Sequence, residues 1–216
     1  MGRSAVESAL RAGAGAEGVK LIETLLWDAA EFGRLALHLA RLERSAALLG
    51  WTCDLGAVQA ALIATVPVGP ARVRLTLDAA GAVDVQALPL PPPVAQWRLG
   101  LAGVRLQAAD VWLSVKSTRR AAYDAARAGL SPGQDEVIFQ NERGEVCDGT
   151  ITTLFFDRGA GLRTPPLTSG LLPGVLRADL LLQGCREEVL LAQDLGEVRL
   201  WLGNALRGLA PAVWRG

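Results

Sequence analysis

The stretch "DEVIFQNERGEVCDGTITTLFFD" (residues 135–157) alternates apolar runs with a single polar turn. The runs "DEVIFQ" and "EVCDG" flank the turn "NERG", so they predict a strand–turn–strand unit, and "TITTLFFD" predicts a further strand. Asp148 lies between two of these apolar runs. A turn aspartate that satisfies nearby backbone N–H groups is the ordinary interpretation of this position, and a functional carboxylate is the alternative.

The patterns around this stretch mix strands and helices without a strict strand–helix–strand rhythm. Before it, they predict strands at 19–27 and 98–106, helices at 32–50 and 55–66, and a hairpin at 72–88. A helix over 117–129 with a Ser/Thr cap should precede it. After it, "VLRADLLLQG" predicts a helix and 187–192, 198–204 and 209–214 predict short extended segments. We therefore expect an α+β protein with a large mixed sheet.

The proline-rich run "PLPPPV" (89–94) interrupts every regular pattern, so we place a domain boundary there. The prediction is a small N-terminal α/β domain, residues 1–93, and a larger C-terminal domain, residues 94–216.

Composition excludes several classes of protein. The 216 residues are half hydrophobic and carry 22 acidic and 22 basic side chains, so a folded core is expected and a nucleic-acid partner is not. The three cysteines have no metal-ligand spacing, and one histidine cannot build a multi-histidine zinc site. No apolar run is long enough to span a membrane, and "MGRSAVESALRAGAGAEG" lacks the apolar core of a signal peptide. We expect a cytoplasmic protein that binds no metal.

Lys116, in "VWLSVKSTRR" (111–120), is one of only two lysines among 22 cationic side chains. A buried lysine can lose its proton and attack a carbonyl as a primary amine, which arginine cannot do. A solvated cation at the end of a strand is the more ordinary interpretation of the position taken alone.

Two further features of the sequence suit the binding of an anion. "SGLLPGVLR" (169–177) places glycines before a predicted helix, whose N-terminal N–H groups suit a phosphate. Arg41 lies in an apolar helical stripe, where a surface ion pair with Glu31 or Glu43 is the ordinary explanation.

Six motifs in order, "LIETL", "HLARLERSAALLG", "KSTRRAAYDAAR", the segment 135–156, "TPPLTSGLLPGVLR" and "LWLGNALRGLAPA", resemble the class IV aminotransferases. The resemblance is greatest to aminodeoxychorismate lyases and covers residues 20–211. It implies a two-domain D-amino-acid aminotransferase-like fold, the cofactor pyridoxal 5'-phosphate, and a homodimer that acts on a small molecule.

The resemblance also implies roles for individual residues. Lys116 is expected to form the Schiff base with the cofactor and to act as the catalytic base. Arg41 and the backbone of Val175 and Leu176 are expected to bind the phosphate, and Asp148 to face the pyridine nitrogen. Arg120, Tyr123 and Thr153 are candidates for the substrate pocket.

The chain departs from the family pattern at several positions. Asp148 replaces the usual Glu, Thr153 an Asn, and Ala205 a Ser that contacts phosphate, and the segment before "LIET" is short. The resemblance implies a lyase that makes 4-aminobenzoate and pyruvate for folate synthesis. An aminotransferase acting on branched-chain or D-amino acids, or a non-catalytic relative that serves as a binding partner, are the alternatives.

Overall fold

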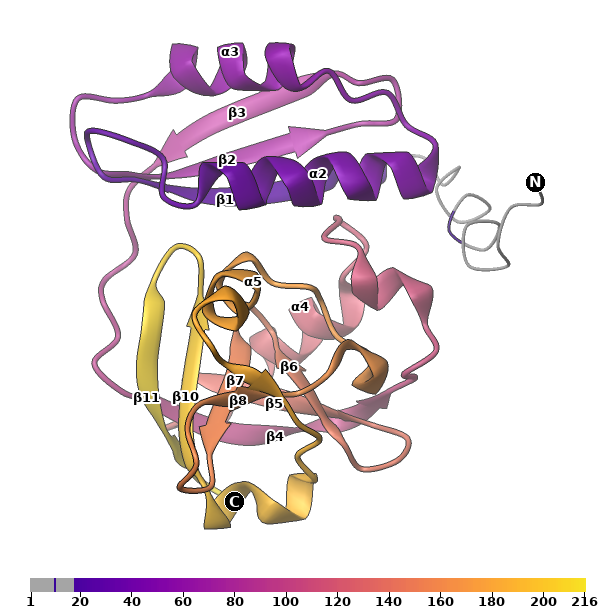
Figure 1. Cartoon of the computed structure of the whole chain (residues 1–216), viewed down its shortest axis with the longest axis vertical. Helices are drawn as coiled ribbons and strands as arrows, with labels where there is room; N and C mark the ends of the chain where they lie inside the picture. The colour runs from indigo at the N-terminus through magenta and orange to yellow at the C-terminus, as the bar shows by residue number, and fades with distance from the viewer. Residues whose placement is uncertain (1–9, 11–17) are drawn as a thin grey trace. The chain divides into compact units, whose positions relative to one another are not determined.

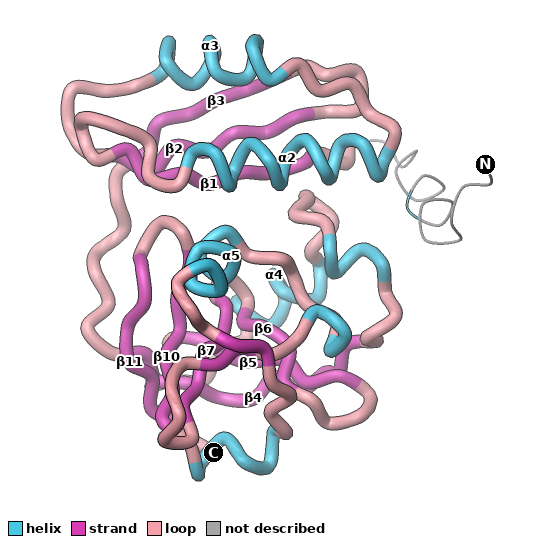
Figure 2. Tube along the Cα trace, in the orientation of Figure 1, coloured by secondary structure: helices cyan, strands magenta, loops and turns pink. Residues whose placement is uncertain are grey.

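The computed structural model describes residue 10 and residues 18–216, so most of the N-terminal stretch considered for a signal peptide lies outside the described residues. The chain divides into two units. The first contains residues 1–92 and 115–119, and the second contains residues 93–114 and 120–216. Residues 89–96, which include the proline-rich run, form a loop as predicted (Figure 2).

The first unit is a three-stranded antiparallel sheet with two helices (Figure 1). Its elements are β1 (Leu21–Trp27), α2 (Leu35–Leu49), α3 (Leu55–Thr65), β2 (Ala71–Leu77) and β3 (Val83–Leu88). The strand order is β1-β2-β3, with α2 packed on β1 and α3 on β3. Alternate residues of β2 are buried, because one face of an antiparallel sheet packs on its helices while the other is less covered.

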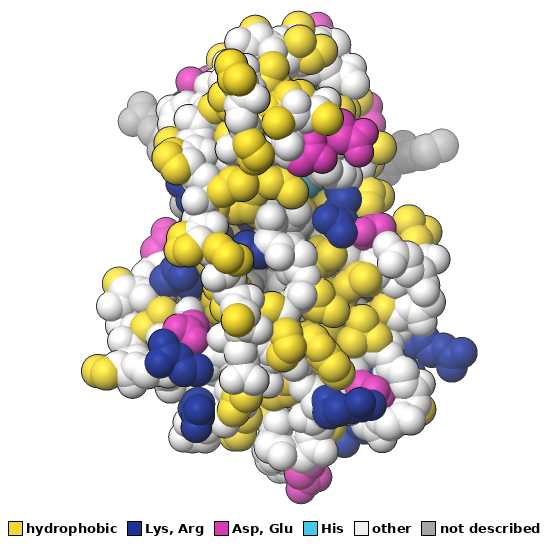
Figure 3. Space-filling model, turned by 90° about the vertical axis from the view of Figure 1, so that its left-hand side faces the viewer, with side chains coloured by type: hydrophobic (Ala, Val, Ile, Leu, Met, Phe, Trp, Pro, Cys, Tyr) yellow, Lys and Arg dark blue, Asp and Glu magenta, His cyan; other side chains and the backbone are white. Residues whose placement is uncertain are grey.

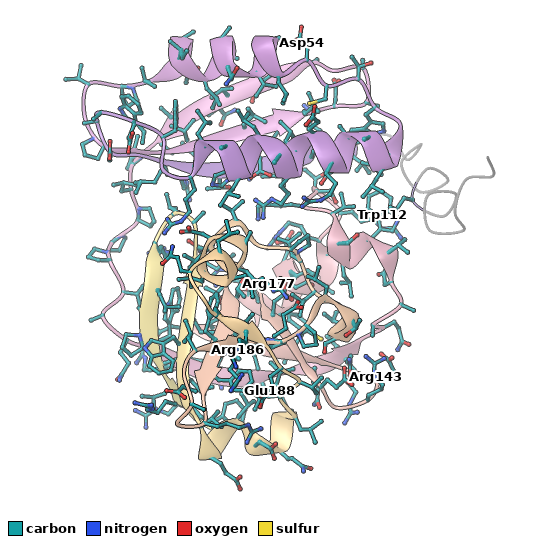
Figure 4. The ribbon with its side chains drawn as sticks, in the orientation of Figure 1. Asp54, Trp112, Arg143, Arg177, Arg186 and Glu188 are labelled. Atoms are coloured by element: carbon teal, nitrogen blue, oxygen red, sulfur yellow. The ribbon has the colours of Figure 1, made fainter. Side chains whose placement is uncertain are left out.

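Local sequence sets the ends of both helices. Gly50 ends α2 with φ at 73°, a left-handed conformation that glycine adopts without steric cost, and its N–H donates to the carbonyl oxygens of Ala46 and Ala47. The Asp54 carboxylate caps α3 by accepting from the N–H groups of Gly56 and Ala57 (Figure 4). The helix predictions for 32–50 and 55–66 are therefore confirmed to within a few residues.

The second unit is built on an eight-stranded mixed sheet. Its strands are β4 (Trp97–Leu106), β5 (Glu136–Asn141), β6 (Val146–Gly149), β7 (Thr153–Asp157), β8 (Arg163–Thr164), β9 (Arg186–Glu187), β10 (Arg199–Asn204) and β11 (Gly208–Trp214). The order is β6-β5-β4-β11-β10-β7-β8-β9, and β4 pairs in parallel with both β5 and β11. Helices α4 (Ala121–Ala128) and α5 (Val175–Leu182) complete the unit with three 3₁₀ helices, Val111–Ser114, Leu167–Ser169 and Ala192–Glu197. The predicted α+β fold is confirmed, with a small antiparallel sheet in the first unit and a large mixed sheet in the second.

Two local predictions were only partly right. The helix expected over 117–129 is present but begins only at Ala121, because Ser117 pairs with Leu21 and Thr118 with Lys20 instead. The Thr118 hydroxyl accepts from the N–H of Lys20 at 3.0 Å, so it does not cap the helix. The segment 187–192 is extended at Glu187 and again at Leu191, which bridges to Glu145, but Ala192 already begins a 3₁₀ helix.

The core of the second unit is an apolar cluster between its strands, with Leu99, Ile138, Leu154, Phe156 and Leu202 all fully buried. On the face shown in Figure 3, charged side chains of both signs are interspersed with apolar ones, in keeping with the zero net charge. No helix in the described part of the chain combines the length and the apolar character that crossing a bilayer requires.

Core packing predicts a large difference between two leucine variants. Leu202→Ala removes a fully buried side chain and should lower the free energy of unfolding by about 2–5 kcal/mol, since a cavity is left behind. Leu182→Ala, at a side chain that is 80% exposed, is the control and should change it by less than about 0.5 kcal/mol. Urea denaturation of both variants measures the difference, and similar losses in the two would contradict this core assignment.

Candidate active site

A buried carboxylate organises the polar residues of the first unit. Glu23, on β1, accepts from Arg41 Nε at 2.9 Å through Oε1 and from Arg41 Nη2 at 2.6 Å through Oε2. His38 Nδ1 lies 2.6 Å from the same Oε2. All three residues are buried, with at most 5% of their surface exposed. The surface partners expected for Arg41, Glu31 and Glu43, are therefore wrong, because the cation is buried and its carboxylate partner comes from the neighbouring strand.

The charges of this cluster depend on one another. Burial would raise the pKa of Glu23, but the adjacent Arg41 and His38 more than offset this and lower it to about 2. Burial lowers the pKa of His38, although the Glu23 carboxylate acts in the opposite direction. Near neutral pH, Glu23 is therefore ionised and the imidazole is neutral, and the cluster holds one ion pair with a hydrogen-bonded ring.

Lys116 belongs to the same unit. Its carbonyl oxygen accepts from the N–H of Ile22 at 2.9 Å, and Ser117 bridges to Leu21, so the lysine segment pairs with β1 directly beside Glu23. Lys116 itself is partly buried, between the buried Val115 and Ser117. Its ammonium group is one of the cations that lower the pKa of His38. The structure thus brings together the two predicted residues Lys116 and Arg41, with Glu23 and His38.

In the second unit, Asp148 is buried at the end of β6. Its Oδ1 accepts from the Tyr123 hydroxyl at 3.2 Å, and its Oδ2 accepts from the N–H of Leu172 at 3.2 Å. Burial and the adjacent Asp148 carboxylate raise the pKa of Tyr123, which stays a hydrogen-bond donor at any ordinary pH. A carboxylate has about four acceptor positions, and the Tyr123 hydroxyl and the Leu172 N–H occupy two of them.

The loop between Asp148 and Thr153 is held by a second buried carboxylate, Glu136. Glu136 accepts from the Thr150 hydroxyl at 2.5 Å, the Ile151 N–H at 3.2 Å and the Thr152 hydroxyl at 3.1 Å. It is fully buried on β5. Glu136 is not among the residues singled out from the sequence, and an acidic side chain next to the apolar run "VIF" was the available signal.

Two arginines donate hydrogen bonds to Thr150 in the same loop. Arg120 Nη2 donates to the Thr150 carbonyl oxygen at 2.8 Å, and its Nε donates to Asp124 at 2.9 Å. Arg127 Nη1 donates to the Thr150 hydroxyl at 3.0 Å. Arg120 and Tyr123, both predicted to line the pocket, therefore contact the two ends of the segment 148–150.

The N-terminus of α5 lies against this loop. A Cβ added at Gly174 would come within 2.8 Å of the Thr153 hydroxyl oxygen, so only glycine allows this close approach. Val175 and Leu176 follow in the first helical turn, where N–H groups have no partner inside the helix. Arg177, labelled in Figure 4, donates to the Pro165 carbonyl oxygen at 3.1 Å and pairs with Glu187. These contacts fix the orientation of the helix.

The turn that contains Ala205 completes this group. Asn204 Oδ1 accepts from the N–H groups of Leu206 and Arg207 at 3.1 and 2.9 Å, and its amide nitrogen donates to the Ile151 carbonyl oxygen at 3.0 Å. The turn is thereby tied to the Glu136-bound loop. The second unit thus brings together Asp148, Tyr123, Thr153, the α5 N-terminus and Ala205.

These donors and acceptors fit pyridoxal phosphate. The cofactor needs an amine for its aldehyde, an acceptor for its pyridine N–H, and donors for a phosphate dianion. The chain supplies a partly buried lysine, a buried carboxylate, a buried arginine, and a helix N-terminus.

The low pKa of Glu23 predicts a dependence of stability on acid. Because its folded-state pKa is about 2 and its ordinary value is 4.5, the ion pair stabilises the fold above pH 4.5, and this stabilisation is lost as pH falls toward 2. The contribution is about 3 kcal/mol. Glu23→Gln should be less stable at pH 7 and should lose less on acidification. Thermal unfolding between pH 2 and 7 checks this, with the exposed Glu43→Gln as the control. An equally steep acid loss in Glu23→Gln would contradict it.

The chain is similar to several known proteins. The amino-transferase class IV family model matches residues 20–213. A candidate aminodeoxychorismate lyase of Schizosaccharomyces pombe is 34% identical over 180 residues, which are 80% of this chain and 77% of that protein. A candidate amino-acid aminotransferase from Mesorhizobium loti has a structure with a TM-score of 0.87 at 43% identity, covering 91% of this chain and 99% of that one.

The 4-amino-4-deoxychorismate lyase of Pseudomonas aeruginosa has the same fold, with a TM-score of 0.79 at 24% identity over 92% of this chain and 84% of that one. The family match covers nearly all of the described residues. The chain therefore belongs to the class IV aminotransferases, a family of pyridoxal-phosphate-dependent enzymes.

Proposed function

We propose that this enzyme is a lyase that converts 4-amino-4-deoxychorismate to 4-aminobenzoate and pyruvate. The observation that carries the proposal is the 34% identity to the S. pombe candidate lyase, together with the lyase-like segments "NERGEVCDGT" and "TPPLTSGLLPG". We assign catalysis to the amine of Lys116, whose segment pairs with the strand that carries the buried Glu23–Arg41 ion pair.

When bound, pyridoxal phosphate supplies an electron sink for the carbon next to the substrate amine. We assign Lys116 Nζ to hold the cofactor covalently and to remove the proton from the substrate carbon that bears the amino group. The C–O bond at the neighbouring ring carbon then breaks. The ring becomes aromatic and the side chain leaves as pyruvate, so all atoms of the substrate are recovered in two products and no second substrate is consumed.

We assign each of the remaining site residues to the part of the cofactor or substrate that its charge or hydrogen-bonding groups suit. Asp148 holds the proton on the pyridine nitrogen, and Tyr123 and the Leu172 N–H keep its carboxylate in place. Arg41, whose guanidinium is oriented by Glu23, binds phosphate, as do the backbone N–H groups of Val175 and Leu176. We assign Arg120 and Thr153 to the substrate side of the pocket.

An aminotransferase acting on branched-chain or D-amino acids is the second candidate, because the M. loti structure at 43% identity is that of a candidate amino-acid aminotransferase. Both reactions use the same cofactor residues. The third alternative, a non-catalytic relative, draws on the departures at Asp148, Thr153 and Ala205, and the retained Lys116 opposes it. We further propose a cytoplasmic homodimer that supplies 4-aminobenzoate for folate synthesis.

The assignment of Lys116 predicts where the cofactor attaches. Borohydride makes the bond between a lysine and pyridoxal phosphate irreversible, so peptide mapping should find the reduced cofactor on residue 116. Lys116→Arg keeps the positive charge but offers no reactive amine, and it should lose the adduct and the visible absorption band. Lys20→Arg is the matched control, since Lys20 is exposed, and should keep both. An adduct on Lys20, or none, would contradict the assignment.

The lyase proposal predicts product formation without a keto acid. The enzyme with 4-amino-4-deoxychorismate should release 4-aminobenzoate and pyruvate in equal amounts, because the cofactor is regenerated in every turnover. A transaminase instead leaves its cofactor in the amine form until a keto acid arrives. Chromatography of the products, alongside absorption spectra with branched-chain and D-amino acids, separates the two. Bleaching of the visible band by one amino acid, reversed by a keto acid, with no 4-aminobenzoate formed, would favour the aminotransferase.

A further inference from the structure

The turn between β5 and β6 holds a second loop of the same unit through polar side chains. Ser169, the last residue of the 3₁₀ helix Leu167–Ser169, is fully buried, and its hydroxyl donates to Glu145 Oε2 at 2.9 Å. The Asn141 side-chain nitrogen donates to the same Oε2 at 2.9 Å and to the Ser169 carbonyl oxygen at 3.0 Å. Asn141 is fully buried as well, so a bond lost here could not be replaced by one to bulk water.

Two further donors hold the backbone of this loop. Arg143, labelled in Figure 4, donates through Nη2 to the Thr168 carbonyl oxygen at 2.9 Å. Cys147 Sγ donates to the Ser169 carbonyl oxygen at 3.2 Å, and Cys147 directly precedes Asp148 on β6. The loop is therefore held both by the turn and by the strand that carries the predicted cofactor carboxylate.

Only two residues separate Ser169 from Leu172, whose N–H donates to Asp148 Oδ2 at 3.2 Å. At the first of them, Gly170, φ is 83° and an added Cβ would lie 2.6 Å from a backbone carbon of another loop, so only glycine fits. The side chain of the second, Leu171, is 2% exposed and belongs to an apolar cluster. Because both intervening residues are fixed, the position of Ser169 determines where the Leu172 N–H lies.

We propose that Ser169 is a positioning residue, held by Asn141 and Glu145 so that the Leu172 N–H stays bonded to Asp148. A carboxylate that loses one of its donors gains rotational freedom, and a ligand that binds it must then remove that freedom at a cost in entropy. The contact with Leu172 is a property of the chain without cofactor. Its value for binding the cofactor rests on the proposed function, in which Asp148 faces the pyridine nitrogen.

The amide-proton signal of Leu172 tests the positioning in the cofactor-free full chain. The chemical shift of a bonded N–H depends less on temperature than that of an N–H exposed to water. Ser169→Ala removes the hydroxyl donor, and Glu145→Gln removes the charge of its acceptor while keeping its shape. In both variants the Leu172 signal should lose its bonded character. The N–H of Leu206, which is bonded to a side chain in another loop of the unit, should keep its own in both.

Asp135→Asn is the matched control for the loss of a carboxylate. Asp135 directly precedes β5, and its Oδ1 accepts from Arg98 Nη2 at 2.7 Å, so it also pairs with an arginine near the surface. This variant should leave the Leu172 signal unchanged, because Asp135 lies at the end of β5 opposite to Asn141.

The affinity for pyridoxal phosphate tests whether Ser169 acts through Asp148. Ser169→Ala should raise the dissociation constant of the cofactor by about three- to tenfold, the effect expected for one hydrogen bond. After Asp148→Ala the same change should have no effect, since no carboxylate is left to position. A general loss of packing would instead weaken binding by the same factor in both backgrounds, and that result would overturn the inference.

These outcomes are distinct from those that decide the proposed function. A transaminase in place of a lyase leaves the inference standing, because both reactions use the same cofactor residues. A chain that takes no cofactor would refute the function, and the Leu172 signal alone would then decide the inference. An unchanged Leu172 signal in both Ser169→Ala and Glu145→Gln would overturn the inference even in an active lyase.

Discussion

The first unit depends on one buried interaction, the bidentate contact of the Glu23 carboxylate with Arg41 and its bond to His38. His38 and Arg41 are three residues apart on α2 and so share one face of the helix, while Glu23 comes from β1. A buried cation without its partner is strongly destabilising, so strand and helix must form together at this point. The same strand also pairs with the Lys116 segment, since the N–H of Ile22 donates to the Lys116 carbonyl oxygen.

The second unit is also organised by a buried carboxylate, that of Glu136, whose partners are hydrogen-bond donors of a loop. Glu136 gathers three consecutive residues, 150–152, through backbone and hydroxyl donors, and thereby sets the path of the chain from Asp148 to Thr153. Asn204 ties the Ala205 turn to this loop, and Gly174 allows α5 to approach Thr153. A loop fixed by buried polar contacts is rigid, which is what a site needs when it must hold a planar ring and a phosphate within small tolerances.

These contacts indicate what the departures from the family pattern change in the site. Asp148 has a shorter side chain than the usual glutamate, and the Tyr123 hydroxyl and Leu172 N–H restrict its carboxylate to one orientation. Ala205 lies in a turn whose shape is set by Asn204, so the backbone is retained although the serine hydroxyl is not. The changes therefore affect individual contacts and leave the framework of the site intact, which favours an active enzyme over a non-catalytic relative.

The sequence by itself determined the α+β class, the helices α2 and α3, the hairpins and the proline-rich break, because periodicity, glycine stops and turn residues are local signals. It also singled out Lys116, Arg41 and Asp148, through residue choice and ordered motifs. Only the tertiary structure decided which groups surround them. The partner of Arg41 is 18 residues away in the sequence, and Ser117 and Thr118 pair with Leu21 and Lys20 instead of capping α4. Hydrogen-bond partners across such separations depend on packing between elements, and no local pattern encodes that packing.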